Sequence, residues 1–113
     1  MSERATTFCV IYQFKVRSGQ EERFKQGWKR MTDAIREQRG GLGSRLHLSS
    51  DGWWLAYAQW PDRATWQAAQ ELPTSPDPEA QAMMADAVEQ RRRPILLEPK
   101  VDLLEPCHAN ATG

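Results

Sequence analysis

The chain has 113 residues, enough for one domain with a thin hydrophobic core. Its 15 basic and 15 acidic residues give a net charge of zero, which argues against nucleic acid and against an anionic membrane surface as partners. No apolar run approaches the roughly 20 residues that span a bilayer, and the N-terminal stretch lacks the apolar core of a signal peptide. These features predict a cytoplasmic globular protein.

The first predicted element is a strand over residues 7–16, which is rich in aromatic and β-branched side chains. One face of this strand is strongly apolar and the other is mixed. The apolar face consists of Phe8, Val10, Tyr12, Phe14 and Val16. This period of two predicts that the apolar face packs on the core. On the mixed face, Cys9 is predicted to be a small buried side chain rather than a nucleophile, and Cys107 falls in the C-terminal tail.

A helix is predicted next. Ser18 and Glu21 have the spacing of a capping box, in which each side chain satisfies a free amide at a helix start. Apolar residues then recur at helical spacing and line one face: Phe24, Trp28, Met31 and Ile35. Gly27 and Ala34 lie beside this stripe and allow close packing, and Gly40-Gly41 ends the helix.

Two further strands are predicted on either side of Asp51-Gly52, a pair typical of a two-residue type I′ turn. Such a turn places Leu48 opposite Leu55 and Leu46 opposite Tyr57, so that these four side chains share the face assigned to the helix-covered core. The opposite face would then carry Arg45, His47, Trp54, Ala56, Ala58 and Trp60. A loop one residue longer would reverse one strand and spoil this sorting.

Asp62 is a suitable N-cap for a second helix, whose apolar face includes Trp66. The proline-rich stretch 72–78 interrupts this helix, and Asp77-Pro78 restarts it as cap and first helical residue. The restarted helix has an apolar side: Met83, Met84, Ala87 and Val88. Arg91 to Arg93 suit its C-terminal end electrostatically.

A last strand is predicted over residues 94–105, where Pro99 implies an edge position or a bulge, and residues 106–113 are predicted to be a flexible tail. The order β-α-β-β-α-β predicts an α+β, ferredoxin-like fold: one domain over residues 1–113 with its core at about 7–105, and a four-stranded antiparallel sheet with helices on one face. The other face would expose an apolar patch of Cys9, Ile11, Trp54, Ala56, Ala58 and Trp60. A patch of this kind predicts a homodimer, sheet against sheet.

Several packing and turn residues resemble the antibiotic biosynthesis monooxygenase family, a group of dimeric α+β barrels. They are Val16-Arg17-Ser18-Gly19, Phe24, Trp28, Gly40-Gly41-Leu42, and Trp60 followed by Asp62-Arg63-Ala64-Thr65-Trp66. The resemblance covers roughly residues 7–104. It implies a homodimer, a pocket between sheet and helices, and oxidation of electron-rich aromatics by O₂ without flavin or metal.

A branch of that family degrades haem with an Asn in the first strand, a Trp inside the second helix and a His beyond it. This chain offers Tyr12 and Ala69 at the first two positions and has no histidine between His47 and His108. Haem degradation is therefore disfavoured. No Cys-x-x-Cys or histidine pair with ligand spacing is present, so no metal is predicted.

Cofactor-free oxygenation needs a dry pocket, a group that holds the phenolic proton and donors for the developing oxyanion. Tyr12 and Tyr57 are the candidate catalytic residues. Phe14, Trp28, Gln59, Trp66 and Met83 are the candidate pocket residues, and Ile11, Arg45, His47, Trp54 and Trp60 are the candidate dimer face.

All of these residues also suit a purely structural role, because buried Tyr and Trp commonly have one satisfied polar tip. Three functions remain open. The first is a small homodimeric monooxygenase acting on an aromatic or quinol-type compound. The others are a non-catalytic binding or stress-response protein and a non-redox enzyme on the same fold. A solidly filled space between sheet and helices would speak against catalysis, and a polar-lined cavity would favour it.

Overall fold

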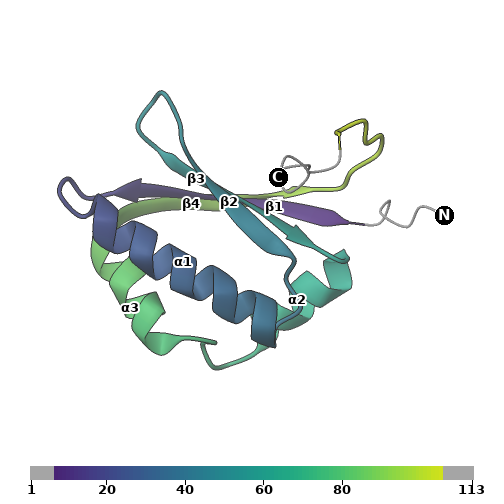
Figure 1. The fold of residues 1–113 in the computed structure, drawn as a ribbon, viewed down its shortest axis with the longest axis horizontal. Helices are drawn as coiled ribbons and strands as arrows, with labels where there is room; N and C mark the ends of the chain where they lie inside the picture. The colour runs from purple at the N-terminus through teal and green to yellow at the C-terminus, as the bar shows by residue number, and fades with distance from the viewer. Residues whose placement is uncertain (1–6, 106–113) are drawn as a thin grey trace, which may run out of the picture.

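The computed structural model describes residues 7–105 and has two layers (Figure 1). A four-stranded antiparallel sheet, in the order β2-β3-β1-β4, carries three helices on one face. The elements are β1 (Phe8–Val16), α1 (Glu21–Gln38), β2 (Gly43–Leu48), β3 (Trp54–Trp60), α2 (Arg63–Glu71), α3 (Pro78–Ala87) and β4 (Val88–Leu97). The predicted ferredoxin-like α+β fold is confirmed. The predictions for the tail, including Cys107 and His108, lie outside the described residues.

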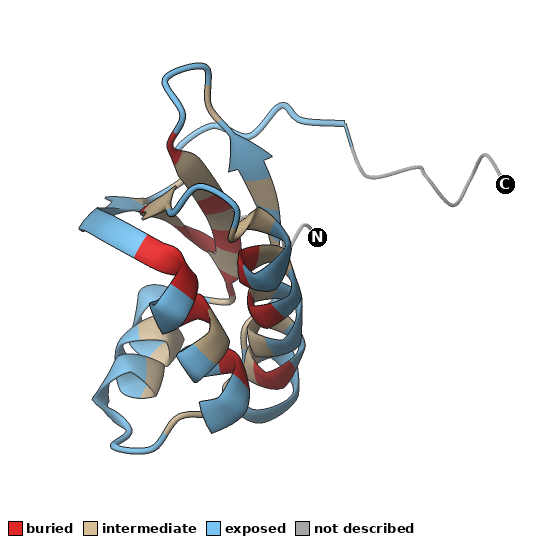
Figure 2. Cartoon of the chain, turned by 90° about the vertical axis from the view of Figure 1, so that its left-hand side faces the viewer, coloured by how far each residue is buried: buried red, intermediate tan, exposed pale blue. Residues whose placement is uncertain are grey.

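The hydrophobic core lies between the sheet and the helices, where the buried residues gather (Figure 2). The alternation predicted for β1 is confirmed, because Phe8, Val10 and Phe14 are all buried on the helix side. Phe24 of α1 is fully buried and meets Phe14 edge-on, with ring centroids 5.2 Å apart. The stripe of α1 therefore meets the apolar face of β1 as its periodicity predicts.

Gly27 brings α1 and α3 close together. A Cβ atom at this position would come within 2.9 Å of Met84 Cγ and 3.1 Å of the Ala80 carbonyl oxygen. A side chain at this position would push the two helices apart, so glycine favours their close approach. The predicted close packing is confirmed, and its partner is α3.

The prediction of a capping box at α1 is wrong. The N-cap residue is Gln20, which makes no side-chain cap hydrogen bond. The chain enters the helix through a turn in which the Gln20 amide donates to the Arg17 carbonyl at 3.0 Å, and Gly19 adopts a positive φ of 85°. The predicted caps of α2 and α3 are both present: Asp62 accepts from the Thr65 amide at 2.7 Å and Asp77 from the Ala80 amide at 3.1 Å.

The predicted register of the hairpin is also wrong, by one residue. Leu46 pairs with Ala56 and Leu48 with Trp54, because the loop spans residues 49–53 instead of two residues. The Ser49 amide donates to the Trp53 carbonyl at 2.8 Å, which closes this longer loop. All side chains of β3 are consequently on the opposite face from the one predicted.

Trp54, Ala56, Ala58 and Trp60 therefore pair with the core side chains of β1 and lie under the helices. Leu55, Tyr57 and Gln59 alternate with them and lie on the open face of the sheet. Two candidates for the dimer face, Trp54 and Trp60, are corrected to the core.

The end of the fold differs as well. Helix α3 ends at Ala87, and Arg91 to Arg93 belong to β4 instead of a helix end. β4 is an edge strand, which is one of the two alternatives predicted, but it begins at Val88 and ends at Leu97, so that Pro99 lies outside it. Pro94 falls inside it, where the pairing with β1 is irregular. No helix in the described part of the chain is long and apolar enough to cross a membrane.

Candidate functional site

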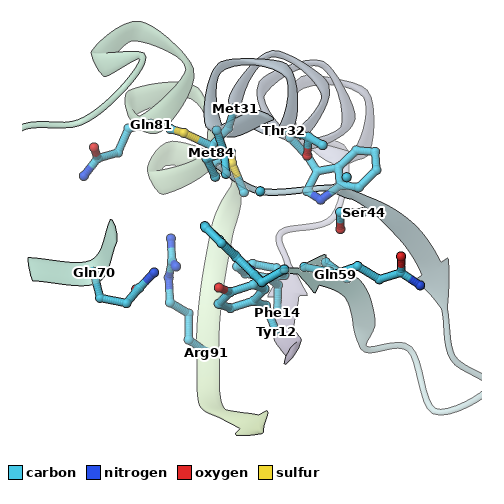
Figure 3. A pocket seen from close by; sticks show the side chains of 17 residues that line it. Tyr12, Phe14, Met31, Thr32, Ser44, Gln59, Gln70, Gln81, Met84 and Arg91 are labelled. Carbon is cyan, nitrogen blue, oxygen red and sulfur yellow. The ribbon is translucent and has the colours of Figure 1, made fainter. Parts of the chain in front are cut away.

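A cavity of about 290 Å³ lies on the helix side of the sheet (Figure 3). The strands contribute Tyr12, Phe14, Ala56, Ala58 and Trp60, and the helices contribute Trp28, Met31, Thr32, Ile35 and Met84. These walls are mostly apolar, as is usual for small-molecule sites. The space between sheet and helices is therefore not filled solidly by side chains.

One side of the cavity is polar. Gln70 of α2, Gln81 of α3 and Arg91 of β4 lie on the same side of Tyr12 in Figure 3. Arg91 extends over the Phe14 ring, with its guanidinium carbon 5.1 Å from the ring centroid. Three separate elements thus bring amide and guanidinium groups to this side, where they can meet the polar part of a ligand.

A second cavity of about 340 Å³ adjoins the first under the segment 72–76. The two share Tyr12, Ile35, Trp60, Gln70 and Gln81. The C-terminal end of α1 holds the segment in place, because Arg39 Nη2 donates to the Thr74 carbonyl at 2.7 Å and Gln38 Nε2 to the Pro76 carbonyl at 3.1 Å. Tyr12 stands at the boundary between an apolar and a more polar chamber.

Tyr12 is the best-defined polar group of the site. Its oxygen accepts a hydrogen bond of 3.0 Å from Trp66 Nε1 on α2. Burial raises the pKa of Tyr12, and the hydrogen bonding from Trp66 and the nearby indole of Trp60 offsets this in part. The phenol is therefore protonated at neutral pH, and it is suited to donate a hydrogen bond rather than to act as a base.

The indole of Trp60 is buried beside Tyr12, only 3% exposed. Its N–H has no hydrogen-bond partner of good geometry among residues 7–105, although it lies close enough to affect the pKa of Tyr12. The Trp66 indole thus donates to the phenol oxygen, whereas the neighbouring Trp60 indole makes no hydrogen bond within these residues.

The structure brings together some of the predicted pocket residues and separates others. Phe14 and Trp28 line the cavity, and Trp66 reaches it through Tyr12. Gln59 touches its edge, but the side-chain amide donates to Tyr57 Oη at 3.3 Å. Met83 packs near Gly27 instead, and its neighbour Met84 lines the cavity.

Tyr57 does not belong to this cavity, because the corrected register turns it to the open face. There its hydroxyl lies 3.2 Å from the Cys9 thiol, and this hydrogen bond is the main reason that the pKa of Tyr57 is raised. Nearby on β2, Arg45 Nε donates to His47 Nε2 at 3.2 Å. Ile11 pairs with Tyr57 and with Ile95 on the same face. The open face is thus more polar than the sequence predicted.

Several polar residues that line the cavity were not predicted to do so from the sequence, among them Gln70, Gln81 and Arg91. Gln70 lies four residues after Trp66, on the same face of α2, and this spacing is a usable signal. Arg91 gave no such signal, since its assignment to a helix end hid the alternation of β4. Within residues 7–105, no three His, Cys, Asp or Glu side chains are grouped as metal ligands.

A ferredoxin-like α+β domain with a cavity between sheet and helices is the class that the fold and the site define. Within this class, the sequence model of the antibiotic biosynthesis monooxygenase family matches residues 7–75, and the chain belongs to this family.

Solved structures share the fold. SnoaB, a cofactor-independent oxygenase from Streptomyces nogalater, is similar with a TM-score of 0.70 and 16% identity, over 89% of this chain and 100% of SnoaB. Rv0793 from Mycobacterium tuberculosis gives a TM-score of 0.66 and 16% identity, over 88% of this chain and 100% of Rv0793. At such identities the likeness establishes the fold alone. No curated protein sequence matches the chain significantly.

Proposed function

We propose that the chain is a monooxygenase that uses O₂ without flavin or metal and acts on a small aromatic or quinol-type compound. The observation that carries the proposal is the cavity itself, where a protonated phenol fixed by an indole stands among apolar walls. Membership of the family supports monooxygenase chemistry, and the proposal extends it to a cytoplasmic homodimer.

The substrate supplies the electrons in this reaction. A ring-activated CH₂ group next to a conjugated carbonyl loses one proton through its enol form, which gives a phenolate-like anion with one hydrogen left on that carbon. The anion transfers one electron to O₂, the two radicals combine at this CH carbon, and the peroxide takes up a proton. The resulting carbon hydroperoxide, CH–OOH, loses water to become C=O. One oxygen atom enters the product and the other leaves as water, so no external reductant is consumed.

The residues of the chain provide the surroundings. Phe14, Trp28 and Met84 exclude water, which strengthens electrostatic interactions in the cavity. Tyr12 donates to the oxygen on which negative charge develops, and Trp66 orients it. Because the pKa of Tyr12 is raised, the donor remains neutral throughout the physiological pH range.

An O₂ electrode tests the proposal. Purified protein is mixed with anthrones, which carry a CH₂ carbon of this kind, and O₂ uptake is compared with the spontaneous rate. We expect Tyr12→Phe to lose about 100-fold of the catalysed rate. Tyr57→Phe removes the same hydroxyl from the open face and is the matched control, with an unchanged rate. Equal uptake with and without protein would contradict the proposal for those substrates.

One observation favours the alternative, a non-catalytic binding protein. Among the described residues that line the first cavity there is no Asp, Glu or His, so no base of ordinary kind is at hand. A protein that binds the same compounds with no gain in O₂ uptake would support this second function.

The proposed homodimer would use the open face. Ile11 and Leu55 provide apolar contacts there, and Arg45 with His47 would fix the relative position of the two sheets. The molar mass in dilute solution, measured by light scattering, tests this part. A monomer at micromolar concentration would contradict it.

A further inference from the structure

The hydrogen bond between Trp66 and Tyr12 has a fixed direction. An indole N–H can only donate, so the phenol oxygen is the acceptor of the 3.0 Å bond. The hydrogen of the phenol must therefore point elsewhere.

Trp60 cannot receive that hydrogen either, since its indole is also a pure donor. Among residues 7–105, no acceptor is hydrogen-bonded to the Tyr12 hydroxyl, which makes one bond there, the one from Trp66. Trp66 thus occupies one side of the oxygen, and the O–H is free to bond to a group inside the cavities that Tyr12 lines.

A ligand in either cavity can provide a hydrogen-bond acceptor for the Tyr12 hydroxyl, because Tyr12 lines both cavities. We infer that Tyr12 is a fixed hydrogen-bond donor to the ligand, that Trp66 is a positioning residue that donates to its oxygen and so directs its hydrogen into the cavities, and that the ligand carries an acceptor oxygen, either a carbonyl or a phenolate. The inference rests on the cavity of the proposed function but does not require oxygenation.

The walls of the cavities place the rest of the ligand. Phe14, Trp28 and Met84 surround an apolar body, such as fused aromatic rings, in the first chamber. The second chamber, with Arg39, Thr74 and Ser75 among its lining residues, accepts a polar substituent. The acceptor oxygen would then lie at the edge of the ring system, between its apolar and polar parts.

This arrangement explains how the site can work without a carboxylate or histidine base. A donor that binds a phenolate better than the neutral phenol lowers the pKa of the bound hydroxyaromatic compound, since hydrogen bonds to the charged form are the stronger ones. The ligand would thus lose its proton to solvent on binding.

The test uses two unreactive compounds of nearly equal shape, 9-fluorenone and fluorene, which differ in one carbonyl oxygen. Affinities are measured by quenching of tryptophan fluorescence, and the carbonyl stretch of the bound ketone by infrared spectroscopy. We expect the wild type to bind the ketone about tenfold more tightly and to lower its stretching frequency. Tyr12→Phe should abolish both effects, and Tyr57→Phe should change neither.

Trp66→Phe separates a positioning role from a merely structural one. With its oxygen free, Tyr12 can turn, so the preference for the ketone should fall about threefold and the carbonyl band should broaden. A merely structural role would weaken both compounds equally and leave the band unchanged, which would overturn the role of Trp66.

The role of Tyr12 is overturned if the wild type shows no preference for the ketone, including the case in which neither compound binds, or if Tyr12→Phe keeps the preference. Failure of O₂ uptake leaves this result intact, because neither compound is oxidised in the assay. Conversely, O₂ uptake without a ketone preference would contradict this inference alone.

Discussion

The two faces of the sheet each carry a tyrosine, and the two tyrosines lie in different surroundings. Tyr12 is under the helices, and its neighbour Trp66 can only donate to it. Tyr57 is on the open face, beside a thiol that can donate or accept and an amide of Gln59 that donates. The pKa of Tyr12 is raised chiefly by burial and that of Tyr57 chiefly by Cys9. The neighbours on each face of the sheet thus determine whether the tyrosine hydroxyl donates or accepts hydrogen bonds.

The largest change in stability should come from placing a charged side chain on the core face of β3 instead of on its open face. Ala56 is 1% exposed under the helices, and its neighbour Leu55 lies on the open face. We expect Ala56→Asp to lower the free energy of unfolding by about 3–5 kcal/mol, since a carboxylate would replace a methyl group in a buried and mostly apolar site. Leu55→Asp should cost less than about 1 kcal/mol. Urea denaturation of both variants measures the difference.

The opposite ranking would contradict the observed register and favour a two-residue turn at Asp51-Gly52. The same pair sharpens the proposed dimer. Leu55→Asp should lower the molar mass in solution to that of one chain while the fold persists. A folded variant that still forms a dimer would exclude Leu55 from the interface.

Features that depend on residues within one element could be predicted from the sequence, whereas features that depend on contacts between distant elements could not. The faces of β1 and α1 could be predicted because Phe8, Val10, Phe14 and Phe24 repeat with the period of their own element. The register of the hairpin could not, because it depends on the length of a loop. The turn residues of the loop indicate where the chain reverses. The last residue of the loop, Trp53, contacts Arg92 of the distant strand β4, and no local pattern reveals this contact.

The candidate site shows the same division. Tyr12, Phe14 and Trp28 follow from periodicity and do line the cavity. Arg91 could not be found, since Ala87-Val88 continues the apolar side of α3 without a proline or glycine to mark the change to β4. The helix therefore ends where the pairing of Val88 with Val16 begins, which is a tertiary cause.

A smaller effect is expected at the start of α2, which carries Trp66 to the covered face. Asp62→Ala removes the acceptor of the Thr65 amide and should lower Tm by about 5 °C. Asp62→Asn keeps a capping oxygen and should lose much less. Thermal unfolding followed by circular dichroism compares the three proteins.

The pH dependence of this cap has a definite sign. Hydrogen bonds from the Thr65 amide and then its hydroxyl hold the pKa of Asp62 below its ordinary 3.8. A lowered pKa in the folded state means that the contribution is present above the ordinary value and is lost as the pH falls through the lowered one. The advantage of the wild type over Asp62→Ala should therefore shrink in acid to about that of Asp62→Asn, and an advantage that stays constant with pH would show that the charge is not involved.

On the open side, the hairpin loop is held by its contact with β4. The guanidinium carbon of Arg92 lies 3.8 Å from the ring centroid of Trp53. Since β1 lies between β3 and β4, this contact links the end of the hairpin to the edge strand. We expect Arg92→Ala to cost about 0.5–1 kcal/mol in urea denaturation. Arg93→Ala removes a neighbouring exposed arginine and is the control. An equal loss in both would mean that the stacking contributes nothing.

The smallest expected difference in stability at neutral pH is the one that Tyr12→Phe and Tyr57→Phe cause. The two variants should differ from each other in alkaline solution. Burial raises the pKa of Tyr12 above its ordinary 10.0, so the folded state holds its proton more tightly than the unfolded chain. The stability that this provides is complete below the ordinary value and is lost as the pH rises through the raised pKa. We therefore expect the wild type to lose stability above about pH 10 more steeply than Tyr12→Phe.

Tyr57→Phe should follow the wild type more closely over the same range, because its hydroxyl is on the open face, where solvent can reach the phenolate. Urea denaturation at closely spaced pH values, with the ionisation of tyrosine followed by absorbance, resolves the two curves. If Tyr57→Phe flattened the alkaline limb and Tyr12→Phe did not, the desolvated phenol would be the one on the open face. Tyr12 would then be free to lose its proton, and its role as a fixed donor in the cavity would fail with it.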